Sequence, residues 1–277
     1  MTGLSDLTAH YERSPIERKH TLPHLRRSPP PATARTPPSL LALAAFALAC
    51  GDDPATPPQE PPPPEDPPCS RTSEAGYVRT DSRFTEGPVF WPAEAVEGCI
   101  PVAFDPVGSK DLPAAAARDA LWRAADSWAA AAEGCGAPLC LRDGGDVPRD
   151  EGLGLREGGP NHNLVTFTVD AATWDALQSP TVIAVTTTTI NARTGALVDA
   201  DVNLNDAHFL FADDEVGAPP DALDLETVLR HELGHLLGFD HGADPGSVMF
   251  PTEASGGERR GLSGDDVAGI CEAFGCY

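Results

Sequence analysis

One run near the C-terminus constrains the fold more than any other part of the chain: His231-Glu-Leu-Gly-His-Leu-Leu-Gly-Phe-Asp-His241. His231 and His235 are four residues apart, so on a helix their side chains project from one face, one turn above the other. Two imidazoles in this arrangement can bind a single metal ion. Gly238 can adopt the left-handed turn that ends a helix, and His241 can then fold back as a third ligand.

Three protein ligands leave a fourth position for water, which is typical of a catalytic rather than a structural zinc. Glu232 lies one residue round the helix from His231, where it can reach a water held by the metal without being a ligand. The three histidines together with Glu232 and Gly238, at these spacings, arise by chance in on the order of 10⁻⁵–10⁻⁴ of chains of this length. We therefore prefer a zinc site to a solvated helix with coincidental histidines, and Glu232 favours a site that is still catalytic.

The helix that carries this run is predicted to begin near Asp221 or Asp224, either of which can cap its N-terminus. Its buried side is supplied by the leucines and the valine of the segment, which are Leu225, Val228, Leu229, Leu236 and Leu237.

The chain before this helix predicts an α/β fold with a twisted sheet. Residues 112–133 are rich in alanine, with large apolar residues at helical spacing, and predict a long amphipathic helix. Apolar or alternating segments predict strands at residues 100–104, 163–169, 181–190 and 196–204. Residues 191–195 end in glycine and predict a hairpin between the last two strands.

Acidic side chains in this region leave a calcium ion possible. The carboxylates that offer hard oxygens are Asp199, Asp201, Asp213, Asp214 and Glu215. They lack the spacing of an EF-hand, and we favour a solvated acidic surface over a calcium site. A second, structural zinc is not expected, because such a site takes four protein ligands and the part of the predicted domain before the zinc helix offers only two histidines, His162 and His208.

The N-terminal part of the chain predicts export. Basic residues precede the apolar run 40–49, which is long enough for a signal-peptide core and too short to span a bilayer. The sequence Ala47-Leu-Ala-Cys50 followed by Gly-Asp-Asp resembles a bacterial lipoprotein signal, in which the cysteine carries lipid and begins the mature chain. An ordinary signal peptide is the alternative. We therefore expect a removed signal region at 1–49 and an envelope or cell-surface location, with the outer membrane favoured, or secretion.

Residues 50–68 are rich in proline and acidic residues and predict an extended linker. Residues 69–277 are then a single domain. Apart from Cys50, this chain has six cysteines, none with a paired spacing suited to zinc, which favours disulfides. The pairs that close short loops, together with the remaining pair, are Cys135–Cys140, Cys271–Cys276 and Cys69–Cys99.

The net charge of −23 argues against nucleic acid as a partner, because phosphates would repel the chain. We expect a soluble monomeric domain, tethered to a membrane only through the lipid on Cys50.

The histidine run resembles the zinc signature of the metzincins. Ser247-Val-Met-Phe-Pro251 is similar to the Met-turn of one metzincin branch, the matrixins, and the segment Leu262-Ser-Gly-Asp-Asp-Val-Ala-Gly-Ile270 is similar to their C-terminal helix. The resemblance implies a mostly parallel sheet with long helices, and a zinc helix followed by the Met-turn. It also implies that Met249 lies beneath the zinc as a hydrophobic support.

The family resemblance implies a zinc endopeptidase. Its ligands would be His231, His235 and His241, and Glu232 would be the catalytic base. Protein or peptide substrates would lie extended along the strand at 181–190. The alternative is a non-catalytic, zinc-bearing surface lipoprotein that acts as an adhesion or binding module.

Overall fold

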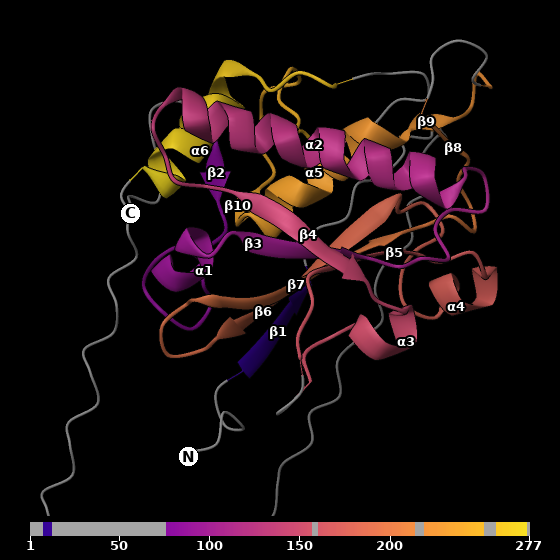
Figure 1. Ribbon diagram of the computed structural model, residues 1–277, viewed down its shortest axis with the longest axis horizontal. Helices are drawn as coiled ribbons and strands as arrows, with labels where there is room; N and C mark the ends of the chain where they lie inside the picture. Colours follow the sequence, from indigo (N-terminus) through magenta and orange to yellow (C-terminus); the bar gives the residue numbers. More distant parts are fainter. Residues whose placement is uncertain (1–7, 13–75, 157–159, 214–218, 252–258, 276–277) are drawn as a thin grey trace, which may run out of the picture. The chain divides into compact units, whose positions relative to one another are not determined.

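The computed structural model describes residues 8–12, 76–156, 160–213, 219–251 and 259–275. A mixed sheet lies beneath the long helices α2 and α5 (Figure 1). In these described ranges, we find no helix with the length and apolar character needed to cross a membrane. Cys50, the predicted linker at 50–68 and most of the predicted signal region lie outside the described residues.

The sheet has the strand order β1-β6-β7-β5-β3-β4. The bounds are β1 (Thr8–Glu12), β3 (Ile100–Phe104), β4 (Leu141–Asp146), β5 (Leu164–Phe167), β6 (Ala184–Asn191) and β7 (Leu197–Leu204). Strands β4, β3, β5 and β7 run parallel to one another, whereas β6 is antiparallel to β7 and β1 is antiparallel to β6. The predicted α/β fold with a mostly parallel sheet is confirmed.

Strands β6 and β7 form the predicted hairpin. Their pairing runs from Ala184 opposite Leu204 to Ile190 opposite Leu197. Gly195 closes the turn with a φ of +79°, a conformation that L-residues rarely adopt. The sequence did not predict β4, because its residues Leu-Arg-Asp-Gly-Gly-Asp show no apolar alternation.

Three helices lie together on one side of the sheet (Figure 1): α2 (Ala114–Gly134), α5 (Leu225–Leu236) and α6 (Gly264–Phe274). Alanines make up much of the buried face of α2, so α5 can approach closely. Trp128 of α2 stacks on Phe239 with ring centroids 5.6 Å apart, and its Nε1 donates a 3.0 Å hydrogen bond to the Arg230 carbonyl of α5. The predicted amphipathic helix at 112–133 is therefore confirmed within two residues.

Shorter elements connect these layers. They are α1 (Ala93–Glu97), α3 (Arg149–Gly152), α4 (Ala171–Asp175), β2 (Val78–Arg79), β8 (Phe211–Ala212), β9 (Leu223–Asp224) and β10 (Phe239–Asp240). Strand β10 pairs with β2, and β8 pairs with β9.

Two disulfides join elements that are distant in sequence. Cys99 bonds Cys140, which ties together the starts of the parallel neighbours β3 and β4. Cys135, at the C-terminus of α2, bonds Cys271 of α6 across 136 residues of sequence. The predicted short-loop pairing is therefore wrong, because spatial neighbours in a parallel sheet and a helix layer need not be close in sequence. Cys69 and Cys276 lie outside the described residues.

The polar face of β7 is buried, which contradicts the favoured solvated acidic surface at this position. Asp199 is 1% exposed and Asp201 is 3% exposed. Asp201 accepts hydrogen bonds from the backbone N–H groups of Gly154 and Leu164, at 2.6 and 2.9 Å. Asp199 Oδ1 has no hydrogen-bond partner among the described residues. Burial raises the pKa of Asp199 to about 8, aided by the Asp201 carboxylate, and burial raises that of Asp201 to about 6.

This carboxyl pair should make stability depend on pH. Between the ordinary pKa of 3.8 and about 8, the folded chain binds more protons on the pair than the unfolded chain does. The contribution of the protonated pair to the free energy of unfolding is thus fully present below pH 3.8 and is lost as the pH rises through about 8. In buffers with a chelator, we expect Asp199→Asn to raise the melting temperature relative to the unaltered chain by an increment that grows from pH 5 to pH 9.

Each kcal/mol should move the melting temperature by about 2–4 °C in a domain of this size. The control is Asp126→Asn, which neutralises an exposed carboxylate of α2. An increment that is independent of pH, or equal in the two variants, would contradict the buried-pair account.

Candidate active site

Helix α5 positions the predicted site residues. Asp224 caps its N-terminus by accepting a 2.9 Å hydrogen bond from the Thr227 backbone N–H. Of the two predicted caps, the structure therefore selects Asp224. The sequence predicted one buried side, yet every residue of α5 is buried, because α2 packs on it from one side and β6 and β7 from the other. His231, Glu232 and His235 are consequently held inside the domain rather than on an outer face.

The chain reverses after α5 at Gly238, whose φ of +95° is the left-handed turn expected there. The reversal forms β10 and brings His241 back toward the helix. Phe239 lies within it, and its carbonyl accepts a 2.8 Å hydrogen bond from His235 Nδ1. The turn thus brings His241 to the site and, through the Phe239 carbonyl, orients His235.

The three histidines converge through their Nε2 atoms. Nε2 of His231 lies 3.0 Å from that of His235 and 3.2 Å from that of His241, and the remaining pair is 3.2 Å apart. They form a group that could hold one metal ion. Three nitrogens bound tetrahedrally to one zinc at 2.0–2.1 Å would be about 3.3 Å from one another. The observed triangle therefore fits zinc closely.

The protonation of the imidazoles also suits a metal. Nδ1 of His231 lies 2.6 Å from the Val248 carbonyl, which can only accept, so the proton is on Nδ1 and the Nε2 lone pair faces the other histidines. His235 is arranged in the same way by Phe239. Burial, followed by the neighbouring His241, lowers the pKa of His231 to about 3, which keeps it neutral. Converging lone pairs on neutral imidazoles repel one another unless a cation lies between them.

Glu232 lies beside this triangle and is 1% exposed. Its Oε2 accepts a 2.5 Å hydrogen bond from the Thr186 hydroxyl of β6. Its Oε1 has no hydrogen-bond partner in the described part of the chain. Burial raises the pKa of Glu232 to about 7, although the Thr186 bond opposes this shift. One oxygen is thus fixed and the other is available to accept a proton.

Met249 packs against the middle of α5. Gly234 lies between His231 and His235 on α5, and a Cβ added to it would lie 2.2 Å from Met249 Sδ. The absence of a side chain at Gly234 thus permits the methionine to pack closely on the helix. Met249 is buried, and its carbonyl accepts a 3.0 Å hydrogen bond from the backbone N–H of Gly242, next to His241. The methionine therefore contacts both α5 and the segment that carries His241.

The sequence does not mark the groups that orient the site. Thr186 belongs to a run of four threonines and carries no motif, so nothing in the sequence singles it out. The carbonyls of Val248 and Phe239 are backbone groups, which a residue pattern cannot reveal. His208, one of the upstream histidines, lies away from the triangle and contacts Asp175 at 2.7 Å.

Comparison with known proteins agrees with this geometry. Residues 149–275 match the family described as matrixin. Metalloendoproteinase 1-MMP of Arabidopsis thaliana is 37% identical over 75 residues, which are 27% of this chain and 21% of that protein. Human matrilysin is 40% identical over 73 residues, covering 25% of this chain and 27% of that protein. Metalloendoproteinase 1 of Glycine max is 41% identical over 54 residues, or 20% and 18% of the two chains.

The chain thus spans about a fifth of the length of the Arabidopsis relative. The family match covers β5, β6, β7, the whole of α5 and α6, and the three converging histidines. Residues 149–275 are therefore a matrixin-like domain of the metzincin type.

Proposed function

We propose that this chain is a zinc-dependent endopeptidase in which His231, His235 and His241 hold the metal. The observation that carries the proposal is the triangle of Nε2 atoms beside a buried carboxylate with one unpartnered oxygen. An adhesion module would need the metal but would have no use for a buried glutamate poised to accept a proton. The matrixin match and the names of the metalloendoproteinase relatives further support the proposal.

When bound, zinc would lower the pKa of a water molecule and polarise the carbonyl of the scissile bond. Glu232 then acts as the general base: Oε1 accepts a proton from the attacking water and later returns it to the leaving amine. Its pKa of about 7 suits both steps, because a group with a pKa near the working pH can take up and release a proton readily. Thr186 holds Oε2 and so keeps Oε1 directed at the reacting atoms.

The substrate would lie along β6, which carries Thr186 and therefore passes beside Glu232. A peptide in extended form can add to a sheet edge through backbone hydrogen bonds. The backbone of β1 (Thr8–Glu12) pairs along part of this edge, opposite residues 187–191. If residues 1–49 are removed as a signal, the edge becomes free for a substrate. Extracellular proteins or peptides are accordingly the proposed substrates.

For a calcium ion, we propose Asp199 and Asp201 as the binding residues. Both carboxylates are buried, and the unpartnered Oδ1 of Asp199 is a hard oxygen without a donor among the described residues. A divalent cation would remove the cost of ionising the pair. When calcium replaces the chelator in the melting series described above, the melting temperature at pH 8 should therefore rise for the unaltered chain and not for Asp199→Asn.

The location can be tested through Cys50. Because an apolar run ends at this cysteine and a proline-rich segment follows, we expect the mature chain to begin at Cys50 and to carry lipid there. Mass spectrometry of the N-terminal peptide from the native envelope should find that modification. An unmodified cysteine, or a different N-terminal residue, would show that the chain is exported by another route.

Removing the Thr186 hydroxyl should impair the base without disturbing the metal. In Thr186→Val, Glu232 loses a bond to its charged form, and such bonds contribute about 1.5–3 kcal/mol, so kcat should fall roughly tenfold or more. The lost bond also favoured ionisation, so the pKa of Glu232 should rise and activity should fall more at pH 6 than at pH 8. The matched control is Thr188→Val on the same face of β6. Equal pH profiles for the two variants would rule out this role for Thr186.

Substitutions of ligand and base should fail differently. His235→Ala removes a metal ligand, so zinc content and peptide cleavage should fall together. Glu232→Gln leaves the three imidazoles in place, so about one zinc per chain should remain while cleavage falls by about 10²–10⁴-fold. Met249→Leu should be much milder. Zinc analysis beside a peptidase assay decides; wild-type cleavage by Glu232→Gln would refute the assignment, and a zinc-loaded chain without activity would favour the binding module.

A further inference from the structure

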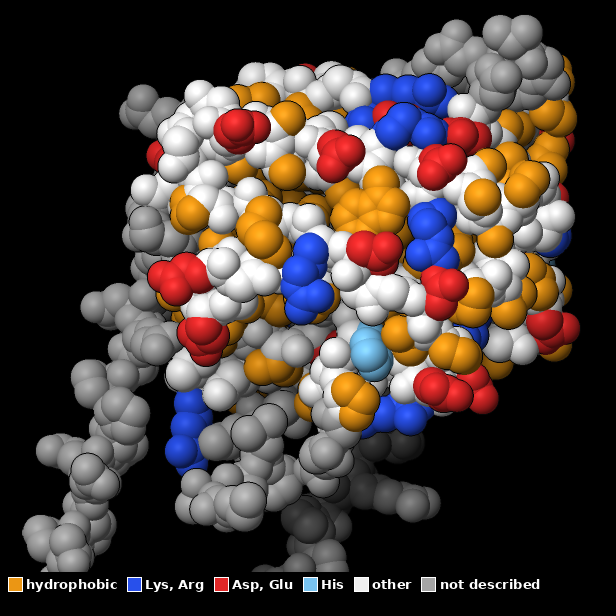
Figure 2. Space-filling model, viewed as in Figure 1, with side chains coloured by type: hydrophobic (Ala, Val, Ile, Leu, Met, Phe, Trp, Pro, Cys, Tyr) orange, Lys and Arg blue, Asp and Glu red, His pale blue; other side chains and the backbone are white. Residues whose placement is uncertain are grey.

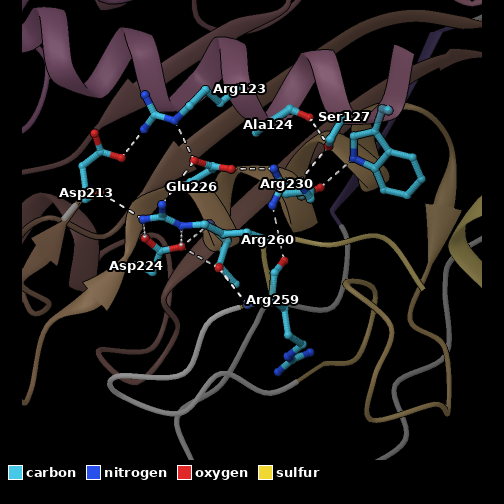
Figure 3. A network of polar contacts seen from close by, with 11 residues as sticks. Arg123, Ala124, Ser127, Asp213, Asp224, Glu226, Arg230, Arg259 and Arg260 are labelled. Carbon is cyan, nitrogen blue, oxygen red and sulfur yellow. Dashed lines mark hydrogen bonds and ion pairs between the residues drawn. The ribbon is translucent and has the colours of Figure 1, made fainter. Parts of the chain in front are cut away.

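A partly buried ion network joins α2, the first turns of α5 and the residues after the Met-turn segment (Figure 3). Glu226 of α5 is 5% exposed and accepts a 2.7 Å hydrogen bond from Arg123 of α2 and a 2.6 Å hydrogen bond from Arg230. Arg260 binds the capping residue Asp224 through two nitrogens, at 2.5 and 3.0 Å. The network therefore fixes Arg259 and Arg260 to the beginning of the zinc helix.

Arg259 is held by its backbone but directs its side chain elsewhere. Its N–H donates a 3.0 Å hydrogen bond to the Thr227 hydroxyl, and its carbonyl lies 3.5 Å from Arg230 Nη1. Figure 3 shows its guanidinium pointing away from the Glu226 network. There Nη1 donates to the carbonyls of Ser247 and Phe250, at 3.0 and 3.4 Å, and the guanidinium carbon lies 5.6 Å from the Phe250 ring centroid.

The two carbonyls that Arg259 contacts flank Val248 and Met249. The Val248 carbonyl accepts the 2.6 Å hydrogen bond from His231 Nδ1, and Met249 packs on α5 at Gly234. Asp266 of α6 holds the same turn from its donor side, at 2.6 Å from the Ser247 hydroxyl and 3.0 Å from the Val248 N–H. The turn is therefore held from two sides: the Asp266 carboxylate accepts hydrogen bonds from its donors, and the Arg259 guanidinium donates hydrogen bonds to its carbonyls.

We propose that Arg259 is a positioning residue for the metal ligand His231. By bridging the Ser247 and Phe250 carbonyls, it fixes the carbonyl of Val248 between them. That carbonyl keeps the proton on Nδ1 and fixes the ring, so the Nε2 lone pair points at the metal position. Partners of this kind commonly affect metal affinity by about 10–100-fold although they never touch the metal. This inference rests on the proposed function, because it takes His231 as a zinc ligand.

Arg260 provides a matched control. It is the adjacent arginine and is partly buried like Arg259. It binds the carboxylates of Asp224 and Glu226 at the beginning of α5 and the backbone carbonyl of Asp213, whereas the side chain of Arg259 binds the carbonyls of the turn. If Arg259 served only general stability, replacing either arginine would have comparable effects on the metal site. If it positions His231, only Arg259 should change how firmly zinc is held.

The experiment measures zinc release from the full-length chain into excess chelator, beside the melting temperature of each metal-free variant. We expect Arg259→Met, which keeps side-chain length without donors, to release zinc about tenfold faster than the unaltered chain. Arg259→Lys keeps the charge but not the fork of donors, and should release zinc at an intermediate rate. Arg260→Met should lower the melting temperature while its zinc release stays within about twofold of the unaltered chain.

Unchanged release from Arg259→Met, or release from Arg260→Met that is equally fast, would overturn the proposal. If Arg259→Met does not fold, Arg259→Lys decides in the same way: faster release supports the proposal, and unchanged release refutes it. An unaltered chain that holds no zinc would instead overturn the proposed function itself. The two failures are therefore distinguishable.

Discussion

The convergence of three imidazole nitrogens within 3.2 Å of one another is the interaction on which the rest of the site depends. At such distances, two nitrogens can share a proton, but His231 and His235 already carry their protons on Nδ1, where backbone carbonyls accept them. The lone pairs that remain repel one another in a buried setting where water cannot screen them. A divalent cation at the centre turns this repulsion into attraction, so the geometry and the proposed zinc explain each other.

The surrounding elements make this arrangement possible. Helix α5 is buried throughout, which removes water from His231 and Glu232 and raises the pKa of the carboxyl group toward neutrality. The disulfide from α2 to α6 and the ion network around Glu226 fix the helices that enclose it. The Met-turn segment then lies between Asp266 and Arg259, and through Val248 it orients a ligand. The geometry of the histidine site thus depends on the packing of α2, α5 and α6.

The sequence predicted the elements whose signals are local. The helix at 114–134, the hairpin of β6 and β7 and the end of α5 at Gly238 all follow from periodicity, turn residues or backbone freedom. It failed where tertiary contacts decide. The cysteines pair between elements that are distant in sequence, β4 pairs with β3, and the carboxylates of Asp199 and Asp201 are buried, with Asp201 bound by the backbone N–H groups of Gly154 and Leu164. The groups that orient the site are backbone carbonyls and one threonine, and no pattern marks them.

In the proposed site, three nitrogen ligands from one helix and the turn that follows it hold a catalytic zinc. X-ray absorption spectroscopy at the zinc edge, on the full-length chain purified without added metal, identifies the atoms bound to the metal and their distances. We expect one zinc per chain with three imidazole nitrogens and one further light ligand at about 2.0–2.1 Å. A zinc bound by sulfur at about 2.3 Å, or a chain that binds no zinc, would contradict the proposed site.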